Sequence, residues 1–182
     1  MLIVVAATLV SLIFLSLALV AINLVVKANR TKTRVSTEAM KKLGKYTLTI
    51  LSMFIAFKII ETLILSFTLS ANLTELPVLV FSFLASLGLF YAAPAIVLEE
   101  KKPVPAFVAS YHHIIKKPQY FVLWLVLAAV LVLLTSTIAF AAFGEGVYRQ
   151  GLMVLLNSLI VMPFLLIMQA QSYLAKYTIL SD

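Results

Sequence analysis

The sequence predicts an all-α fold: a polytopic transmembrane bundle of five helices with an interfacial amphipathic helix on its cytoplasmic side. The 182 residues are 63% hydrophobic and only 12% charged, whereas a soluble domain is near half apolar and a quarter charged. The apolar residues form long stretches rather than alternating ones, which favours membrane helices over a membrane β-barrel. The basic residues gather in two polar segments, as is typical of cytoplasmic loops.

The first predicted span covers residues 2–26, long enough to cross a hydrocarbon layer of ~30 Å. A signal peptide is the alternative, but the stretch has no basic leader, which favours an uncleaved span. The polar segment 27–45 carries seven basic residues against the single acid Glu38. We expect a cytoplasmic loop that contacts anionic lipid headgroups, with Ser36 or Thr37 capping a short helix before the next span.

The second predicted span, residues 46–70, contains Lys58 and Glu61 near the middle of the bilayer. Three residues apart on a helix, their side chains share a face and can pair, and Thr62 continues the polar arc. Charges at this depth cost at least ~2.5 kcal/mol each on insertion scales, so they should face protein or water. Two roles remain open: an ion pair that ties helices together, or a proton or ion site.

The third predicted span, residues 78–98, has one side of small residues that lets a neighbouring helix approach closely: Ser82, Ala85, Ser86 and Gly88. Pro94 near its end should kink or loosen the last turn. The second polar segment, residues 99–118, follows. Its acids Glu99 and Glu100 fit an ordinary charged loop edge, and a lipid-acting enzyme that uses them or His112 is a third functional alternative.

From Ala106 the polar segment becomes amphipathic, which predicts a short helix in the headgroup layer. We assign to this helix Phe107, Ser110, Tyr111, Ile114, Lys116 and Lys117. On our assignment Ile115 belongs to its apolar side, and the polar side includes His112 and His113. Adjacent helical residues point about 100° apart, and the chain has no third histidine, so no metal site is predicted here.

The fourth and fifth predicted spans, residues 120–143 and 151–173, are joined by a tight turn that contains two glycines. Pro163 cannot donate a hydrogen bond to Leu159, so the fifth span should bend there. Asn157 lies near that bend and could bond across to another helix. Together with Lys58, Glu61 and Thr62 on the second span, Asn157 and Pro163 make up the predicted intramembrane polar site.

Five spans place both polar segments and the carboxyl terminus on the same side of the membrane. Twelve of the fourteen lysines and arginines lie on that side; Lys58 and Arg149 are the exceptions. The positive-inside rule then predicts a multi-pass cell-membrane protein whose amino terminus is outside and whose carboxyl terminus is cytoplasmic. The same bias accounts for the net charge of +7 without any binding of nucleic acid.

One stretch, residues 91–124, is similar to a known family. The residues involved are Pro94-Ala95-Ile96-Val97-Leu98-Glu99, then Ala106 and Ser110, then Lys116-Lys117 before a new span. They resemble the glycerophosphodiester phosphodiesterase membrane domain and related polytopic membrane families. The resemblance implies a membrane module without an established catalytic site, typically with six spans, and it assigns no catalytic residue here.

No nucleophile–base pair, metal cluster or phosphate loop is visible in the sequence. We therefore predict a non-catalytic subunit or scaffold of a membrane assembly, without a cofactor. Its expected partners are the lipid bilayer and either another membrane protein or further copies of the chain. The alternative is a small transporter or ion pathway lined by Lys58, Glu61, Asn157 and the bend at Pro163.

Overall fold

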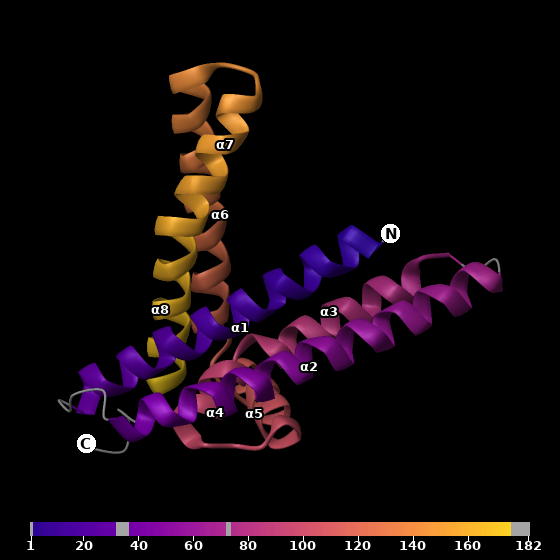
Figure 1. Cartoon of the computed structure of the whole chain (residues 1–182). Helices are drawn as coiled ribbons and strands as arrows, with labels where there is room; N and C mark the ends of the chain where they lie inside the picture. Colours follow the sequence, from indigo (N-terminus) through magenta and orange to yellow (C-terminus); the bar gives the residue numbers. More distant parts are fainter. Residues whose placement is uncertain (1, 32–36, 72–73, 176–182) are drawn as a thin grey trace. The chain divides into compact units, whose positions relative to one another are not determined.

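The computed structural model describes residues 2–31, 37–71 and 74–175, and no strand occurs among them (Figure 1). The predicted all-α fold class is confirmed. Five helical segments of the described chain are long and apolar enough to cross a membrane, which makes this a multi-pass membrane protein: Ala6–Asn29, Lys41–Ser70, Leu76–Glu99, Pro118–Phe143 and Val147–Leu174.

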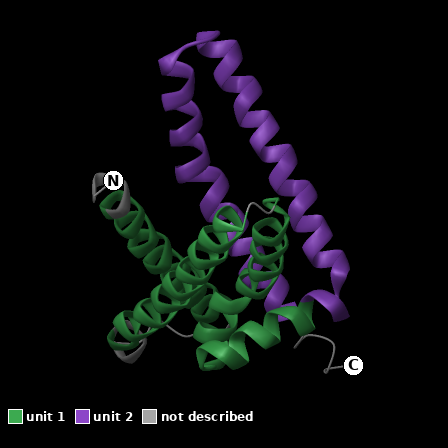
Figure 2. Ribbon diagram, turned by 90° about the vertical axis from the view of Figure 1, so that its right-hand side faces the viewer, with its two compact units in different colours: residues 1–113 green, residues 114–182 purple. Residues whose placement is uncertain are grey.

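The chain forms two compact units, residues 1–113 and residues 114–182 (Figure 2). The sequence by itself predicts one membrane domain, residues 1–182. Each unit is described by itself below. The first contains α1 to α4 and most of α5. The second contains the two long helical arms that follow α5.

Helices α1 (Leu2–Thr31) and α2 (Thr37–Ser70) extend beyond the predicted first and second spans. The segment 27–45 is therefore helical wherever the structure describes it, because its Lys, Arg, Glu, Met and Ala residues are good helix formers. Residues 32–36 and the side chains of 37–40, where a helix cap was expected, lie outside the described part of the chain.

In the first unit, α2 and α3 (Leu76–Phe90) form an antiparallel hairpin, and α1 packs on α2 and on α4 (Ala92–Glu99). Both views show α1 diverging from this hairpin toward its own amino-terminal end (Figures 1 and 2). Six consecutive residues of α4, Ala92 to Val97, are buried. A helix that is apolar and small all round suits such a central position.

The predicted third span is broken at Tyr91, between α3 and α4. Pro94 stands in the first turn of α4, where it has no N–H and its ring clashes with a carbonyl four residues earlier. The hydroxyl of Ser110 from α5 (Pro103–Lys116) fills the gap. It donates to Leu87 O over 2.6 Å and accepts from Tyr91 N–H over 2.9 Å, and such an insertion into the backbone ladder bends a helix.

Helix α5 packs on α3 through the side that carries Phe107, Ser110 and Tyr111. The Phe107 ring covers Gly88, where a Cβ atom would lie 2.0 Å from it, and the Tyr111 hydroxyl donates to the carbonyl of Leu84. A helix lies at the predicted position, and these residues contact protein. That this helix lies in the headgroup layer stays a prediction.

The assignment of His113 to the polar side of α5 is wrong. His113 is buried edge-on against the Tyr91 ring, with the ring centroids 4.5 Å apart. Ile115 is exposed. The buried stripe is Ala106, Ser110 and His113, which repeats at helical spacing. Lys117 lies beyond the end of α5, with φ −137°, because the following proline disfavours helical backbone in the residue before it.

The second unit is a helical hairpin of α6 (Pro118–Phe143) and an interrupted arm that contains α7 (Val147–Leu156), η1 (Asn157–Val161) and α8 (Met162–Leu174). Positive φ angles at Gly144 and Gly146 form the predicted turn between the arms. Trp124 Nε1 donates to Leu165 O over 2.9 Å, and Lys117 Nζ donates to Ala175 O over 3.3 Å. These bonds fix the antiparallel register of the hairpin.

Candidate functional site: a charged cluster within the membrane span

Lys58 and Glu61 form an ion pair on α2, as their spacing predicts. Lys58 Nζ lies 2.6 Å from Glu61 Oε2. Ser82 of α3 donates its hydroxyl to the other carboxylate oxygen, Oε1, over 2.7 Å. The carboxylate therefore ties α2 to α3. Thr62, the third residue of the predicted arc, donates to the Lys58 carbonyl oxygen over 2.8 Å, within its own helix.

Lys58 lies deep within the apolar part of α2. The apolar span runs from Lys41 to Ser70. At 1.5 Å per residue, Lys58 is therefore about 26 Å from one end and about 18 Å from the other. A lysine near a helix end can extend its ammonium to the headgroup layer, but this depth exceeds the length of the side chain. The Lys58 side chain is nevertheless 62% exposed, against 28% for Glu61.

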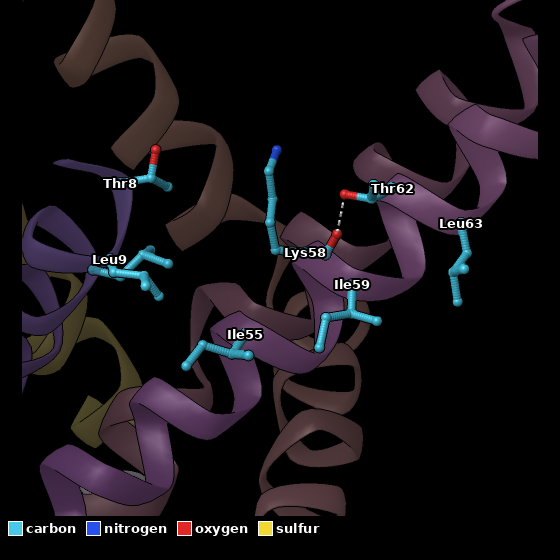
Figure 3. A pocket seen from close by; sticks show the side chains of 8 residues that line it. Thr8, Leu9, Ile55, Lys58, Ile59, Thr62 and Leu63 are labelled. Atoms are coloured by element: carbon cyan, nitrogen blue, oxygen red, sulfur yellow. Dashed lines mark hydrogen bonds between the residues drawn. The ribbon is translucent and has the colours of Figure 1, made fainter. Parts of the chain in front are cut away.

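Two open clefts of the first unit meet at Lys58. The larger, about 430 Å³, lies between α1 and α2. Figure 3 shows Lys58 extending from α2 into the space toward which Thr8 and Leu9 of α1 project. The second cleft, about 340 Å³, adds Glu61 and Ser82 from the α3 side. Apart from a few polar groups the walls are apolar; they include Leu9, Leu12, Ile55, Ile59 and Leu63 in the larger cleft and Phe54, Phe57 and Phe81 in the smaller.

The other two residues of the predicted polar site, Asn157 and Pro163, belong to the second unit. The predicted bond from Asn157 to another helix is confirmed: the Thr135 hydroxyl of α6 donates to Asn157 Oδ1 over 3.0 Å. A bend is predicted at Pro163; directly before it the structure has η1, one turn of π-helix. Such turns accommodate a missing backbone donor and occur often at functional sites. That Asn157 and Pro163 share a site with Lys58 stays a prediction.

A second group of charges lies at the end of the first unit opposite the α2–α3 turn. Lys42 Nζ is 2.9 Å from Glu100 Oε1, and Lys101 Nζ is 2.7 Å from Glu99 Oε2. The hydrogen-bonded Lys42 ammonium holds the pKa of Glu100 below its ordinary value of 4.5. Lys27 Nζ donates to Val97 O over 3.4 Å, near the carboxyl end of α4, where a cation is favourable. Both acids thus take part in ion pairs; Glu100 is about half exposed, whereas Glu99 is mostly covered.

The sequence predicted the charged residues Lys58 and Glu61, but it did not predict which residues of other helices lie around them. From the sequence, Ser82 was expected only to let a neighbouring helix approach closely. Its hydroxyl, on the small face of the third span, was a signal that it could also donate a hydrogen bond to Glu61. Thr8 and Leu12 of α1 line both clefts. Nothing in their local sequence distinguishes them from the rest of the first span.

No protein-family model, curated protein or solved structure matches this chain. What the site can do therefore follows from its own chemistry. A cleft with mostly apolar walls and a few convergent polar groups has the usual make-up of a ligand or partner site. The Lys58 ammonium has three N–H donors, and a partner that enters the cleft meets it directly.

Proposed function

We propose that this protein is a non-catalytic subunit or scaffold of a membrane assembly, and that its intramembrane cleft receives a transmembrane helix. One observation carries the proposal: the Lys58 side chain is 62% exposed although it lies about 18 Å from the nearer end of its span. A lysine at the centre of a membrane helix costs roughly 2.5–3.5 kcal/mol, and that cost falls when protein covers the charge.

The surroundings of the pair favour association over a relay. Glu61 accepts hydrogen bonds from both Lys58 and Ser82, and the clefts around them are walled mainly by leucine, isoleucine and phenylalanine. A proton relay needs a series of titratable groups, whereas this cluster combines one paired acid with apolar walls. Polar groups of this kind hold transmembrane helices together.

The orientation we propose is an outside amino terminus and a cytoplasmic carboxyl terminus, from the positive-inside bias. Exposed lysines such as Lys41, Lys45, Lys102 and Lys116 would then contact anionic headgroups. The resemblance of residues 91–124 to the glycerophosphodiester phosphodiesterase membrane domain is in keeping with a membrane module. It assigns no residue to the Lys58 cluster.

A photo-crosslinking amino acid at position 59 tests the proposal in native membranes. Ile59 lines the larger cleft, and the adjacent Ile60 is exposed but lines neither cleft, so position 60 is the matched control. We expect protein adducts from position 59 that Lys58→Met reduces, and few from position 60. Lipid adducts alone, equal at the two positions, would contradict a proteinaceous occupant.

A small ion pathway is the second candidate, because two open clefts converge on Lys58. Its test is flux of protons or alkali cations through vesicles that contain the purified chain. The candidate predicts a flux that both Lys58→Ala and Glu61→Gln abolish. A flux that survives both substitutions would remove these residues from the pathway, and no flux in the unaltered protein would exclude the candidate for these ions.

A further inference from the structure

We propose that α5 is embedded in the membrane through a second apolar face, formed by Val104, Val108 and Ile115, which contacts the acyl chains of the leaflet in which it lies. The occupant of this face is lipid rather than protein. None of the three residues lines the clefts around Lys58, so the inference goes beyond the proposed function and does not rest on it.

The three residues form a stripe on the side of α5 that faces away from protein. They follow one another at intervals of four and seven residues, which places them on one side of a helix. Ile115 follows the buried Ala106 by nine residues, so at 100° per residue the stripe lies opposite the buried side. Val104 is 74% exposed, Val108 46% and Ile115 73%. The sequence predicts one apolar side for this helix, whereas the structure gives it two.

The contacts on the protein side of α5 indicate how deep the helix lies. The Phe107 ring covers Gly88 and stacks on Phe57, with the ring centroids of the two phenylalanines 4.9 Å apart. Gly88 lies well inside the apolar segment Leu76–Glu99, and Phe57 well inside the apolar segment Lys41–Ser70. A helix that packs on the interior of two membrane-crossing segments has hydrocarbon rather than water on its outer side.

Both ends of α5 are held close to membrane spans. Residues 100–102 join it to the apolar segment that ends at Glu99, and Lys117 alone joins it to the segment that begins at Pro118. Each residue of extended chain reaches at most ~3.6 Å, so neither end of α5 can move far from the membrane. The exposed stripe is therefore continuous with the lipid-facing surface of the spans.

The charges around the stripe favour a lipid surface as its partner. Between Glu100 and Glu145 the chain has no acidic residue. Lys102, just before α5, and Lys116, in its last turn, are both exposed. Lysines at the ends of an apolar stripe can extend their ammonium groups to lipid phosphates while their methylene chains stay among apolar groups. Basic residues beside an apolar face are typical of helices that lie in the plane of the membrane boundary.

Fluorescence quenching in phosphatidylcholine vesicles tests the inference. The purified full chain, which has no cysteine of its own, receives one cysteine with an environment-sensitive dye at position 108 or 115. Position 116 is the matched control, because Lys116 is exposed but points about 100° around the helix from Ile115.

We expect the dyes of Val108→Cys and Ile115→Cys to be quenched by lipids with a nitroxide on the acyl chain. Their quenching by aqueous iodide should be lost, and their emission should shift to shorter wavelength. The dye of Lys116→Cys should be quenched by iodide and little by acyl-chain nitroxides.

Three results would overturn the proposal. Equal quenching by iodide at positions 108, 115 and 116 would show that the stripe faces water. Protection from both quenchers at 108 and 115 would show that protein covers it. Quenching by headgroup nitroxides in place of acyl-chain ones would leave the helix in the headgroup layer.

Thermal unfolding in detergent checks that the labelled variants fold. Each should unfold at the temperature of the unaltered chain, because the substituted side chains are exposed. If Val108→Cys unfolds earlier, Val104→Cys takes its place, since Val104 is the most exposed member of the stripe.

Discussion

At the scale of single residues, the contact between Gly88 and Phe107 sets the distance between α3 and α5. The Phe107 ring cannot easily move aside, because it stacks on Phe57 with the centroids 4.9 Å apart and meets the Tyr111 ring at 5.2 Å. The small face predicted for the third span therefore serves an aromatic side chain from the same unit.

Gly88→Ala should destabilise the folded chain by about 1–3 kcal/mol, the usual cost of overpacking, because the added Cβ would lie 2.0 Å from the Phe107 ring. Thermal unfolding in detergent measures the change. Gly44→Ala is the control: it is helical, nothing lies within 4 Å of its Cβ position, and alanine stabilises a helix interior by about 0.5–1 kcal/mol relative to glycine. Equal stabilities of the two variants would show that the ring relocates freely.

The Lys42–Glu100 ion pair predicts a pH dependence. Lys42 lowers the pKa of Glu100 in the folded chain, so the pair stabilises the fold above the ordinary value of 4.5. That contribution is lost as the pH falls through the lowered pKa. Because both side chains are about half exposed, its size stays within about 1 kcal/mol.

Lys42→Met should raise the pKa of Glu100, which NMR titration of labelled glutamate measures. Its thermal stability should lie below that of the unaltered chain near neutral pH and converge with it in acid. Lys45→Met, one turn further along the same helix, is the control. A Glu100 titration that Lys42→Met leaves unchanged would assign the lowered pKa to another group.

At the scale of elements, the break between α3 and α4 depends on residues from two different segments. Pro94 prevents a continuous helix, and the Ser110 hydroxyl bonds to the carbonyl of Leu87 and to the N–H of Tyr91 at the break. Pro94, Ala106 and Ser110 are all buried in the first unit.

Ser110→Ala should destabilise the folded chain by about 1–3 kcal/mol, because it removes both hydrogen bonds from a buried site. Hydrogen exchange of the Tyr91 amide should also become faster. Ser86→Ala is the control, since that exposed hydroxyl bonds only to its own helix. If Ser110→Ala matches Ser86→Ala in both measurements, the inserted hydroxyl does not hold the break.

At the scale of the whole molecule, the five apolar helical segments and their polar connections predict a membrane topology that cysteine labelling can test. The positive-inside bias predicts that cysteines replacing Lys41 and Lys102 react from the same face of the membrane, and that one replacing Glu145 reacts from the opposite face. All three positions are exposed, so membrane-impermeant reagents can reach them. Labelling of Lys41→Cys and Lys102→Cys from opposite faces would contradict this membrane topology and the proposed orientation of the termini.

The sequence by itself determined that the fold is all-α and that its long helices are apolar enough to lie in lipid. Apolar stretches of twenty or more residues are helical in lipid whatever surrounds them, because every backbone group must find its partner within the segment. Spacing alone also predicted the pair of Lys58 and Glu61, since three residues make nearly one helical turn.

Only the tertiary structure decided which groups complete those local features. Ser82 lies twenty-one residues from Glu61, and Ser110 lies nineteen from Tyr91, so neither contact has a signature in local periodicity. His113 is buried although it was expected on the polar side of α5, because the side of α5 that packs on protein follows from where Tyr91 and Gly88 lie. Residue spacing within a segment determines which side chains share one face of a helix. Long-range packing determines which residues of other segments contact that face.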